Sequence, residues 1–180
     1  MIAQKLKSNP WWEAFRAGSL RFVRTKTAVR LLAASTAIPA LLLFVQILRN
    51  WVNIPYWDEW ELIARLRISL QAGTLRPLDL FAQHNDSRFV VPQLILLPLA
   101  RWTHWDLRAE MIVIFATACL ISWVLWGLLG KIENLPRPLR IGCLLVCNCL
   151  LFSPLQYETW LWGINLSFVL PPFCFCSPCG

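Results

Sequence analysis

One uncharged apolar run, residues 31–48, constrains this chain more than any other feature of its sequence. Eighteen residues in an α-helix rise about 27 Å, close to the thickness of the hydrocarbon core of a bilayer. A cleaved signal peptide would end in a small-residue cleavage site, whereas this run ends in Gln46, Ile47 and Leu48 before Arg49. We therefore predict an uncleaved transmembrane helix over residues 31–48.

The composition agrees with a membrane protein. Of 180 residues, 57% are hydrophobic and only 15% are charged, and the mean hydropathy is +0.53. Eleven Trp, ten Phe and two Tyr exceed what one small soluble core can bury, whereas a bilayer offers both hydrocarbon and interfacial positions for them. The composition thus argues against a soluble cytoplasmic protein and favours an all-α, polytopic membrane fold.

The net charge of +7 is concentrated before the first apolar run. Basic segments beside a span stay on the cytoplasmic side and attract anionic lipid, so residues 1–30 are predicted to be cytoplasmic and to contact membrane lipid. The cations are not interleaved with stacking aromatics, which argues against nucleic acid as a partner. Seven cations lie there against the single acid Glu13: Lys5, Lys7, Arg16, Arg21, Arg24, Lys26 and Arg30.

Two further spans are predicted, over residues 109–129 and 139–155. The basic loop 130–138 between them is expected in the cytoplasm. Residues 156–180 are expected to form an outer loop and a broken or truncated fourth apolar segment, interrupted at Asn165 and at Pro171 and Pro172.

The apolar segment 89–100 decides the topology, because a fourth crossing here would reverse every later element. Twelve residues rise only about 18 Å as a helix, so we predict an interfacial or re-entrant segment. Residues 49–108 then form one extracytoplasmic loop. Within it, residues 61–72 are predicted to be an amphipathic juxtamembrane helix that ends at Gly73 and whose polar face has Arg65 and Arg67.

Adjacent carboxylates, Asp58 and Glu59, stand between Trp57 and Trp60 just after the first span. Carboxylates near the headgroups can accept a proton from an attacking hydroxyl or bind a divalent cation through oxygen. The alternative is an interfacial aromatic anchor with incidental acids that only solvate the loop.

A second polar cluster follows at His84, Asn85 and Arg88. An imidazole, an amide and a guanidinium in one short loop can bind a phosphate or sugar hydroxyls. Glu110, at the mouth of the second predicted span, is a functional candidate because ionisable groups near membrane depth are costly, and its expected partner is Arg101 or Arg108. No metal site is predicted from the seven cysteines, and no recognised motif of a soluble enzyme occurs in the chain.

Three segments resemble a family of uncharacterised bacterial polytopic membrane proteins that have PYWDEW, HNEHR-like and WLWGFQ-like motifs. The matching residues are 55–60, 79–85 with Arg88, and 160–163, and the similarity covers about residues 51–170. The chain departs from the pattern at Asp86 and Ser87 and at Ile164 and Asn165. The resemblance implies that this sequence corresponds to the N-terminal portion, or fragment, of a protein with more spans.

The layout is in turn similar to membrane glycosyltransferases of the GT-C architecture, which use polyprenyl-phosphate sugars on the extracytoplasmic side. This similarity implies an inner-membrane enzyme with Asp58 as general base or metal contact and Glu59 second. The competing class is a non-catalytic assembly partner or transporter fragment. The substrate-binding residues that the resemblance implies are Trp57, His84, Asn85, Arg88, Glu158 and Trp162.

Overall fold

The computed structural model describes residues 25–60, 62–82, 89–133 and 135–176, with side chains except at residues 58, 62, 63 and 172–176. These residues form helices and connecting loops without any strand, which confirms the predicted all-α class. In chain order the helices are α3 (Lys26–Ser35), α4 (Ile38–Asn50), η1 (Trp57–Glu59), α5 (Leu62–Gln71), η2 (Pro77–Phe81), α6 (Val90–Trp102), α7 (Leu107–Lys131), α8 (Arg137–Leu151), η3 (Pro154–Gln156), α9 (Tyr157–Leu161), η4 (Gly163–Asn165) and α10 (Leu166–Cys176).

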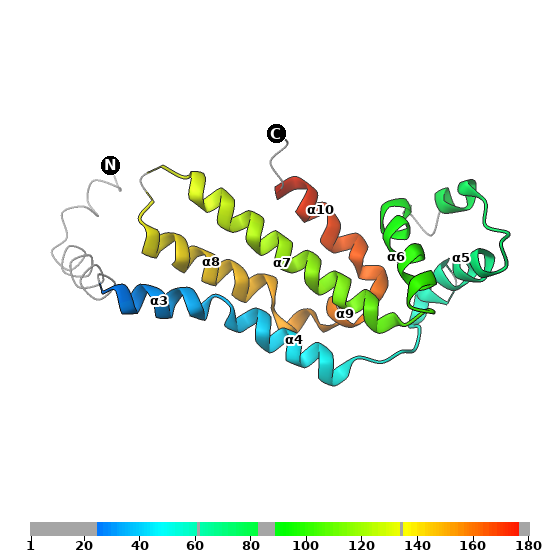
Figure 1. The fold of residues 1–180 in the computed structure, drawn as a ribbon, viewed down its shortest axis with the longest axis horizontal. Helices are drawn as coiled ribbons and strands as arrows, with labels where there is room; N and C mark the ends of the chain where they lie inside the picture. The colour runs from blue at the N-terminus through cyan, green and yellow to red at the C-terminus, as the bar shows by residue number, and fades with distance from the viewer. Residues whose placement is uncertain (1–24, 61, 83–88, 134, 177–180) are drawn as a thin grey trace, which may run out of the picture.

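Most of the length of the molecule is a helix bundle. The consecutive helices α3 and α4 pack on α8, which packs on α7, and α10 lies on the far side of α7 (Figure 1). Helices α5 and α6 gather at one end of this bundle, while the start of α3 and the α7–α8 connection lie at the other end (Figure 1). The polar loop 51–82 is thereby kept at one end only.

Three helical stretches are long and apolar enough to cross a membrane: Lys26–Asn50, Leu107–Lys131 and Arg137–Leu161. Their outward faces expose large apolar side chains such as Leu42, Val146 and Leu150. Such continuous apolar surface needs lipid rather than water around it. The prediction of a multi-span membrane protein is confirmed at this level.

The first of these stretches is interrupted between α3 and α4. Pro39 is the second residue of α4 and has no N–H group to continue the hydrogen-bond ladder from α3. The carbonyl of Thr36, in the turn between α3 and α4, accepts a hydrogen bond from Asn148 Nδ2 of α8 at 2.8 Å, and Asn148 Oδ1 accepts one from Ser122 of α7 at 2.7 Å. One asparagine therefore links all three membrane-crossing stretches.

Proline and a capping aspartate determine where the later helices begin and end. Asp106 caps α7 by accepting from the N–H of Arg108 at 3.0 Å. Pro154 follows the end of α8, where the chain turns through η3 into α9.

The fourth apolar segment is interrupted by the η4 turn around Asn165. A second break was expected at Pro171 and Pro172, but α10 continues through both prolines. Each proline removes one N–H group, and the remaining hydrogen bonds hold the helix.

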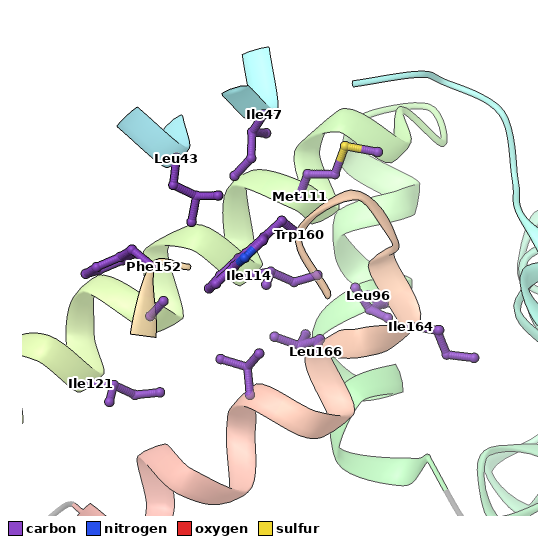
Figure 2. Close-up of a cluster of buried hydrophobic side chains, with 12 residues drawn as sticks. Leu43, Ile47, Leu96, Met111, Ile114, Ile121, Phe152, Trp160, Ile164 and Leu166 are labelled. Carbon is purple, nitrogen blue, oxygen red and sulfur yellow. The ribbon is translucent and has the colours of Figure 1, made fainter. Parts of the chain in front are cut away.

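The main hydrophobic cluster lies where the bundle meets α6 and α9. Trp160 of α9 lies at its centre between Leu43 and Ile47 of α4 and Ile114 of α7 (Figure 2). The indole N–H of Trp160 donates to the carbonyl of Ser153 at 3.1 Å, so its one polar atom is satisfied inside the cluster. Leu96 of α6 and Leu166 of α10 extend the cluster towards the loop end.

A second, smaller cluster joins α5 to α6 through Leu66 and Leu97. Helix α5 ends before Gly73, whose φ of +71° is the left-handed conformation that glycine adopts without strain. Helix α6 is apolar but has only 13 residues, shorter than a bilayer requires. Together α5 and α6 form a compact helical unit on the end of the bundle.

Candidate functional site

Glu59 is a buried carboxylate at the end of η1, immediately after the first membrane-crossing stretch. Its residue is only 3% exposed, and its Oε2 accepts a hydrogen bond from the N–H of Tyr56 at 3.0 Å. The local turn thus folds the side chain back onto its own backbone as an N-terminal capping box. Glu59 Oε1 has no hydrogen-bond partner among the described residues.

Burial raises the pKa of Glu59 above its ordinary value, because desolvation disfavours the charged form. The N–H of Tyr56, the guanidinium of Arg67 and the amides of Gly163 and Ile164 act in the opposite direction and hold the increase down. The carboxylate is therefore a stronger base than an exposed glutamate.

Arg67 of α5 donates through Nη2 to Glu110 Oε1 of α7, and each residue is only 1% exposed. The guanidinium also lies over the ring of Trp105, with Cζ 5.1 Å from the centroid, as a cation–π contact. Burial lowers the pKa of Arg67 to about 10, although Glu59 opposes this change, so the guanidinium is still charged at neutral pH.

The pair corrects two sequence-based expectations. Arg67 is not on a solvated face: it follows Ile63 by four residues and precedes Leu70 by three, so helical spacing places it beside the apolar positions. Glu110 pairs with neither Arg101 nor Arg108. Arg108 is two residues from Glu110 on α7 and hence on a different face, and it binds Asp106 instead, at 2.8 Å.

Gly163 brings the WLWG segment into contact with both acids. A Cβ at this position would overlap Glu110 Oε2 and would come within 3.0 Å of Glu59 Oε1. These two oxygens are the ones that lack a hydrogen-bond partner among the described residues, and they flank the same point. Only glycine leaves space for two carboxylates there. We refer to Glu59, Arg67, Glu110 and Gly163 as the acid cluster.

Strained backbone surrounds the acid cluster. Trp57, His104 and Trp105 have φ values of 47°, 55° and 67°, which non-glycine residues adopt rarely. Each such residue costs on the order of 1–3 kcal/mol, and such residues concentrate at functional sites. The conformation of Trp105 directs its ring against Arg67, and Trp57 lies two residues before Glu59.

Aromatic side chains lie next to the acid cluster. The rings of Tyr56 and Trp162 meet edge to face with centroids 5.5 Å apart, and Trp57 is 5.8 Å from Tyr56 and 6.3 Å from Trp162. Tyr56 and Trp57 are exposed, while the indole Nε1 of Trp162 is buried with no hydrogen-bond partner among the described residues. A ligand here would meet aromatic faces beside a carboxylate.

Unpartnered buried polar atoms are concentrated at this end of the molecule. Native proteins leave few such atoms, so their concentration here marks this end of the molecule as the candidate site. Among the described residues they are Glu59 Oε1, Arg67 Nε and Nη1, Gln93 Nε2 and Oε1, Trp105 Nε1, Glu110 Oε2 and Trp162 Nε1.

Two carboxylates share one arginine in the acid cluster, an arrangement suited to accepting a proton. Arg67 is the counter-charge of both carboxylates, through its ion pair with Glu110 and its electrostatic interaction with Glu59. The described residues contain no group of three His, Cys, Asp or Glu side chains that could hold a metal ion. The chemistry that this arrangement supports is proton transfer.

The other predicted site residues divide between described and undescribed parts of the chain. Trp57 and Trp162 lie beside the acid cluster, as above. The side chain of Glu158 is exposed and accepts a hydrogen bond from the hydroxyl of Tyr157 at 3.2 Å, so it points to the surface rather than into the buried cluster. His84, Asn85, Arg88 and the side chain of Asp58 lie outside the described residues.

Comparison with protein-family profiles, curated proteins and solved structures finds no match for this chain.

Proposed function

We propose that this chain is a membrane-embedded sugar transferase, or the site-bearing part of one, that uses a polyprenyl-phosphate sugar on the extracytoplasmic side. The observation that supports this proposal best is the contact between Glu59 and Gly163. They belong to the PYWDEW and WLWG segments, about a hundred residues apart, which carry the resemblance to the uncharacterised polytopic membrane proteins. Glu59 is the kind of acid that such chemistry uses, early in the first outer loop.

In the proposed reaction, an acceptor hydroxyl attacks the anomeric carbon of the sugar and the bond from that carbon to the lipid phosphate breaks. The hydroxyl proton passes to a carboxylate, and the lipid phosphate leaves with the electron pair of the broken bond. Glu59 suits the role of general base because burial raises its pKa and Oε1 is unpaired. Asp58 is the neighbouring candidate. Tyr56, Trp57 and Trp162 would bind the apolar face of the sugar ring.

The proposed orientation has the N-terminus in the cytoplasm of a bacterial inner membrane. Lys26, Lys131 and Arg137 lie at the ends of α3, α7 and α8 that are distant from α5 and α6 (Figure 1). Cations favour the cytoplasmic side, which supports an extracytoplasmic acid cluster. A periplasm-active reporter fused after Arg76 should be active, and one fused after Pro136 should be inactive. The reverse result at Pro136 would contradict this orientation.

The decisive experiment measures transfer of a radiolabelled hexose from polyprenyl phosphate to endogenous acceptors in membrane vesicles containing the full chain. Glu59→Gln preserves shape and removes the base, so transfer should fall at least about a hundredfold. Asp58→Asn tests the adjacent acid in the same assay. Glu133→Gln is the matched control, because this glutamate is exposed in the connection between α7 and α8, at the end of the bundle distant from α5 and α6, and it should retain activity. Equal membrane abundance of all variants separates loss of chemistry from loss of fold.

A non-catalytic assembly partner is the second candidate, favoured by the burial of Glu59, Arg67 and Glu110. In that case the cluster only joins the α5–α6 unit to the bundle. Two results would support this candidate and contradict the proposed transferase activity. In the first, wild-type vesicles transfer no hexose; in the second, the Glu59→Gln and Asp58→Asn variants both transfer it at the wild-type rate.

A further inference from the structure

Helices α4 and α8 lie side by side (Figure 1), and an apolar groove runs between them. Its volume is about 370 Å³. Sites for small molecules measure about 300–1,000 Å³ and are lined mainly by apolar side chains with a few polar groups. No charged side chain lines the groove. Its main lining residues are Ile38, Leu42 and Gln46 of α4, Leu145 and Cys149 of α8, and Phe152 directly after α8.

The groove opens on the outward surface of the membrane-crossing stretches. Ile38 and Leu42 are 50% and 67% exposed, and Cys149 is exposed on α8. Both helices belong to stretches that are long and apolar enough to cross a membrane. Hydrocarbon rather than water surrounds an apolar surface at this depth. Because lipid is the most abundant molecule there, mass action favours a lipid chain as the occupant.

The groove is elongated in the direction of the helices. Its lining residues recur every three or four positions on α4 and on α8, so it follows both helix axes. From Ile38 to Gln46 it extends about 12 Å. A groove that follows membrane-crossing helices has the same direction as the acyl chains of the surrounding lipid, so one chain can enter it without turning.

A polar side chain, Gln46, lies at the end of the groove nearer to the polar loop 51–82. It precedes Arg49 by three residues, about 4.5 Å along the helix, so it lies where the hydrocarbon meets the headgroups. The carbonyl of Gln46 accepts a bond from Asn50, but its half-buried amide makes no hydrogen bond within the part of the chain that the structure describes. Such an amide favours a ligand that supplies an acceptor oxygen at this level.

We propose that this groove binds one acyl chain of a phospholipid and that the Gln46 amide donates a hydrogen bond to the ester carbonyl of that chain. The chain extends from Gln46 towards Ile38 and covers Leu42 and Phe152. An isoprenoid chain has no carbonyl group for Gln46, which favours a phospholipid over the polyprenyl donor. The groove contains no residue of the acid cluster, so the proposal does not depend on sugar transfer.

Native mass spectrometry of the full chain, released from detergent micelles, tests the proposal by titration with two phosphatidylcholines of equal chain length, one ester-linked and one ether-linked. The ester-linked lipid should bind about threefold more tightly, the average effect of one hydrogen bond within a membrane. Gln46→Leu removes the amide with little change of volume, so it should abolish this preference and leave ether-linked binding unchanged. Asn50→Leu is the matched control and should retain the preference, because Asn50 bonds to its own helix and does not line the groove.

A second variant tests the groove itself. Cys149→Trp places a large side chain in the groove, so it should weaken binding of both phosphatidylcholines about tenfold. Leu150→Trp is its matched control, because Leu150 is an exposed neighbour at nearly the same depth that does not line the groove, and it should change binding little. Gln46→Leu changes little volume, so it keeps the proposal testable even where the larger side chain disturbs the fold.

Equal affinity of the wild-type chain for the ester-linked and ether-linked lipids, or equal effects of Cys149→Trp and Leu150→Trp, would overturn the proposal. Displacement of phosphatidylcholine by equimolar polyprenyl phosphate would assign the groove to an isoprenoid chain. A two-chain species that Cys149→Trp abolishes would assign it to a second copy of this chain. Either result would overturn the phospholipid assignment. None of these measurements records sugar transfer, so failure here leaves the proposed function intact and the reverse also holds.

Discussion

Arg67 and Glu110 form a buried ion pair although 43 residues separate them in the sequence. Arg67 belongs to the outer helix α5, and Glu110 belongs to the first turns of the membrane-crossing helix α7. The position of the outer unit on the bundle therefore depends on charge pairing as well as on apolar packing between α6, α7 and α10.

Replacing one partner of this pair should destabilise the protein strongly. Arg67→Met leaves Glu110 buried without its counter-charge, which typically costs about 3–5 kcal/mol. The double variant Arg67→Met with Glu110→Leu should recover much of that loss, because both charges of the pair are removed together and Glu59, whose pKa burial already raises, is the acid of the cluster that remains. Thermal unfolding in mild detergent measures the stability of the single and of the double variant. Arg108→Gln, which breaks the exposed pair with Asp106, should change little. A double variant as unstable as Arg67→Met would contradict the pairing.

Gly163→Ala should disturb the acid cluster, because the new Cβ would overlap Glu110 Oε2. The carboxylate or the η4 turn must shift, at a cost of about 1–3 kcal/mol. Gly127→Ala in α7 is the control: nothing lies within 4 Å of its Cβ position, and alanine favours a helix interior by roughly 1 kcal/mol. Unfolding temperatures of the two variants should therefore move in opposite directions, and equal shifts would count against the crowded site at Gly163.

The raised pKa of Glu59 predicts a pH dependence of stability. The folded state keeps the Glu59 proton to higher pH than the unfolded state, whose value is near 4.5. The stabilisation that protonated Glu59 provides is therefore fully present below the unfolded-state pKa. It is lost as the pH rises from that pKa through the higher pKa of the folded state. Glu59→Gln mimics the protonated form, so the difference in unfolding temperature between wild type and this variant should change across that range. Arg67 stays charged throughout, with a pKa of about 10, and Glu110 is common to both proteins. A difference that is constant from pH 4 to 8 would show that Glu59 titrates normally.

Asn148→Ala should loosen the bundle, since it removes the donor to the Thr36 carbonyl and the acceptor for Ser122. Hydrogen bonds between membrane helices contribute on average about 0.6 kcal/mol and up to about 1.7 kcal/mol each. The matched control is Asn50→Ala, because the Asn50 side chain is exposed and donates to the Gln46 carbonyl of its own helix, not to another membrane-crossing stretch that the structure describes. Equal unfolding temperatures for the two variants would indicate that the Asn148 bridge is not a stabilising link.

Part of the candidate site follows from local sequence. Glu59 was predicted because it stands between aromatic residues just after the first span, and the structure brings Trp57 and Trp162 beside it. Glu110 was predicted because a charge in an apolar segment is costly. The sequence does not predict that Arg67 is the partner of Glu110, because proximity along the chain favours Arg101 or Arg108 instead. The helical spacing of Arg67 with Ile63 and Leu70 was the signal that could have placed it on the buried face.

Length and hydropathy of the sequence alone determined that the chain is helical and has three stretches able to cross a membrane, because a backbone in hydrocarbon must satisfy its own hydrogen bonds. Tertiary structure alone decided that Arg67 meets Glu110 and that Gly163 lies against Glu59. Those contacts join segments about 40 to 100 residues apart, and they depend on how α5, α7 and η4 pack together rather than on any local preference. A period of 3.6 residues identifies the face of a helix that will be buried, but not the residue that it will meet there.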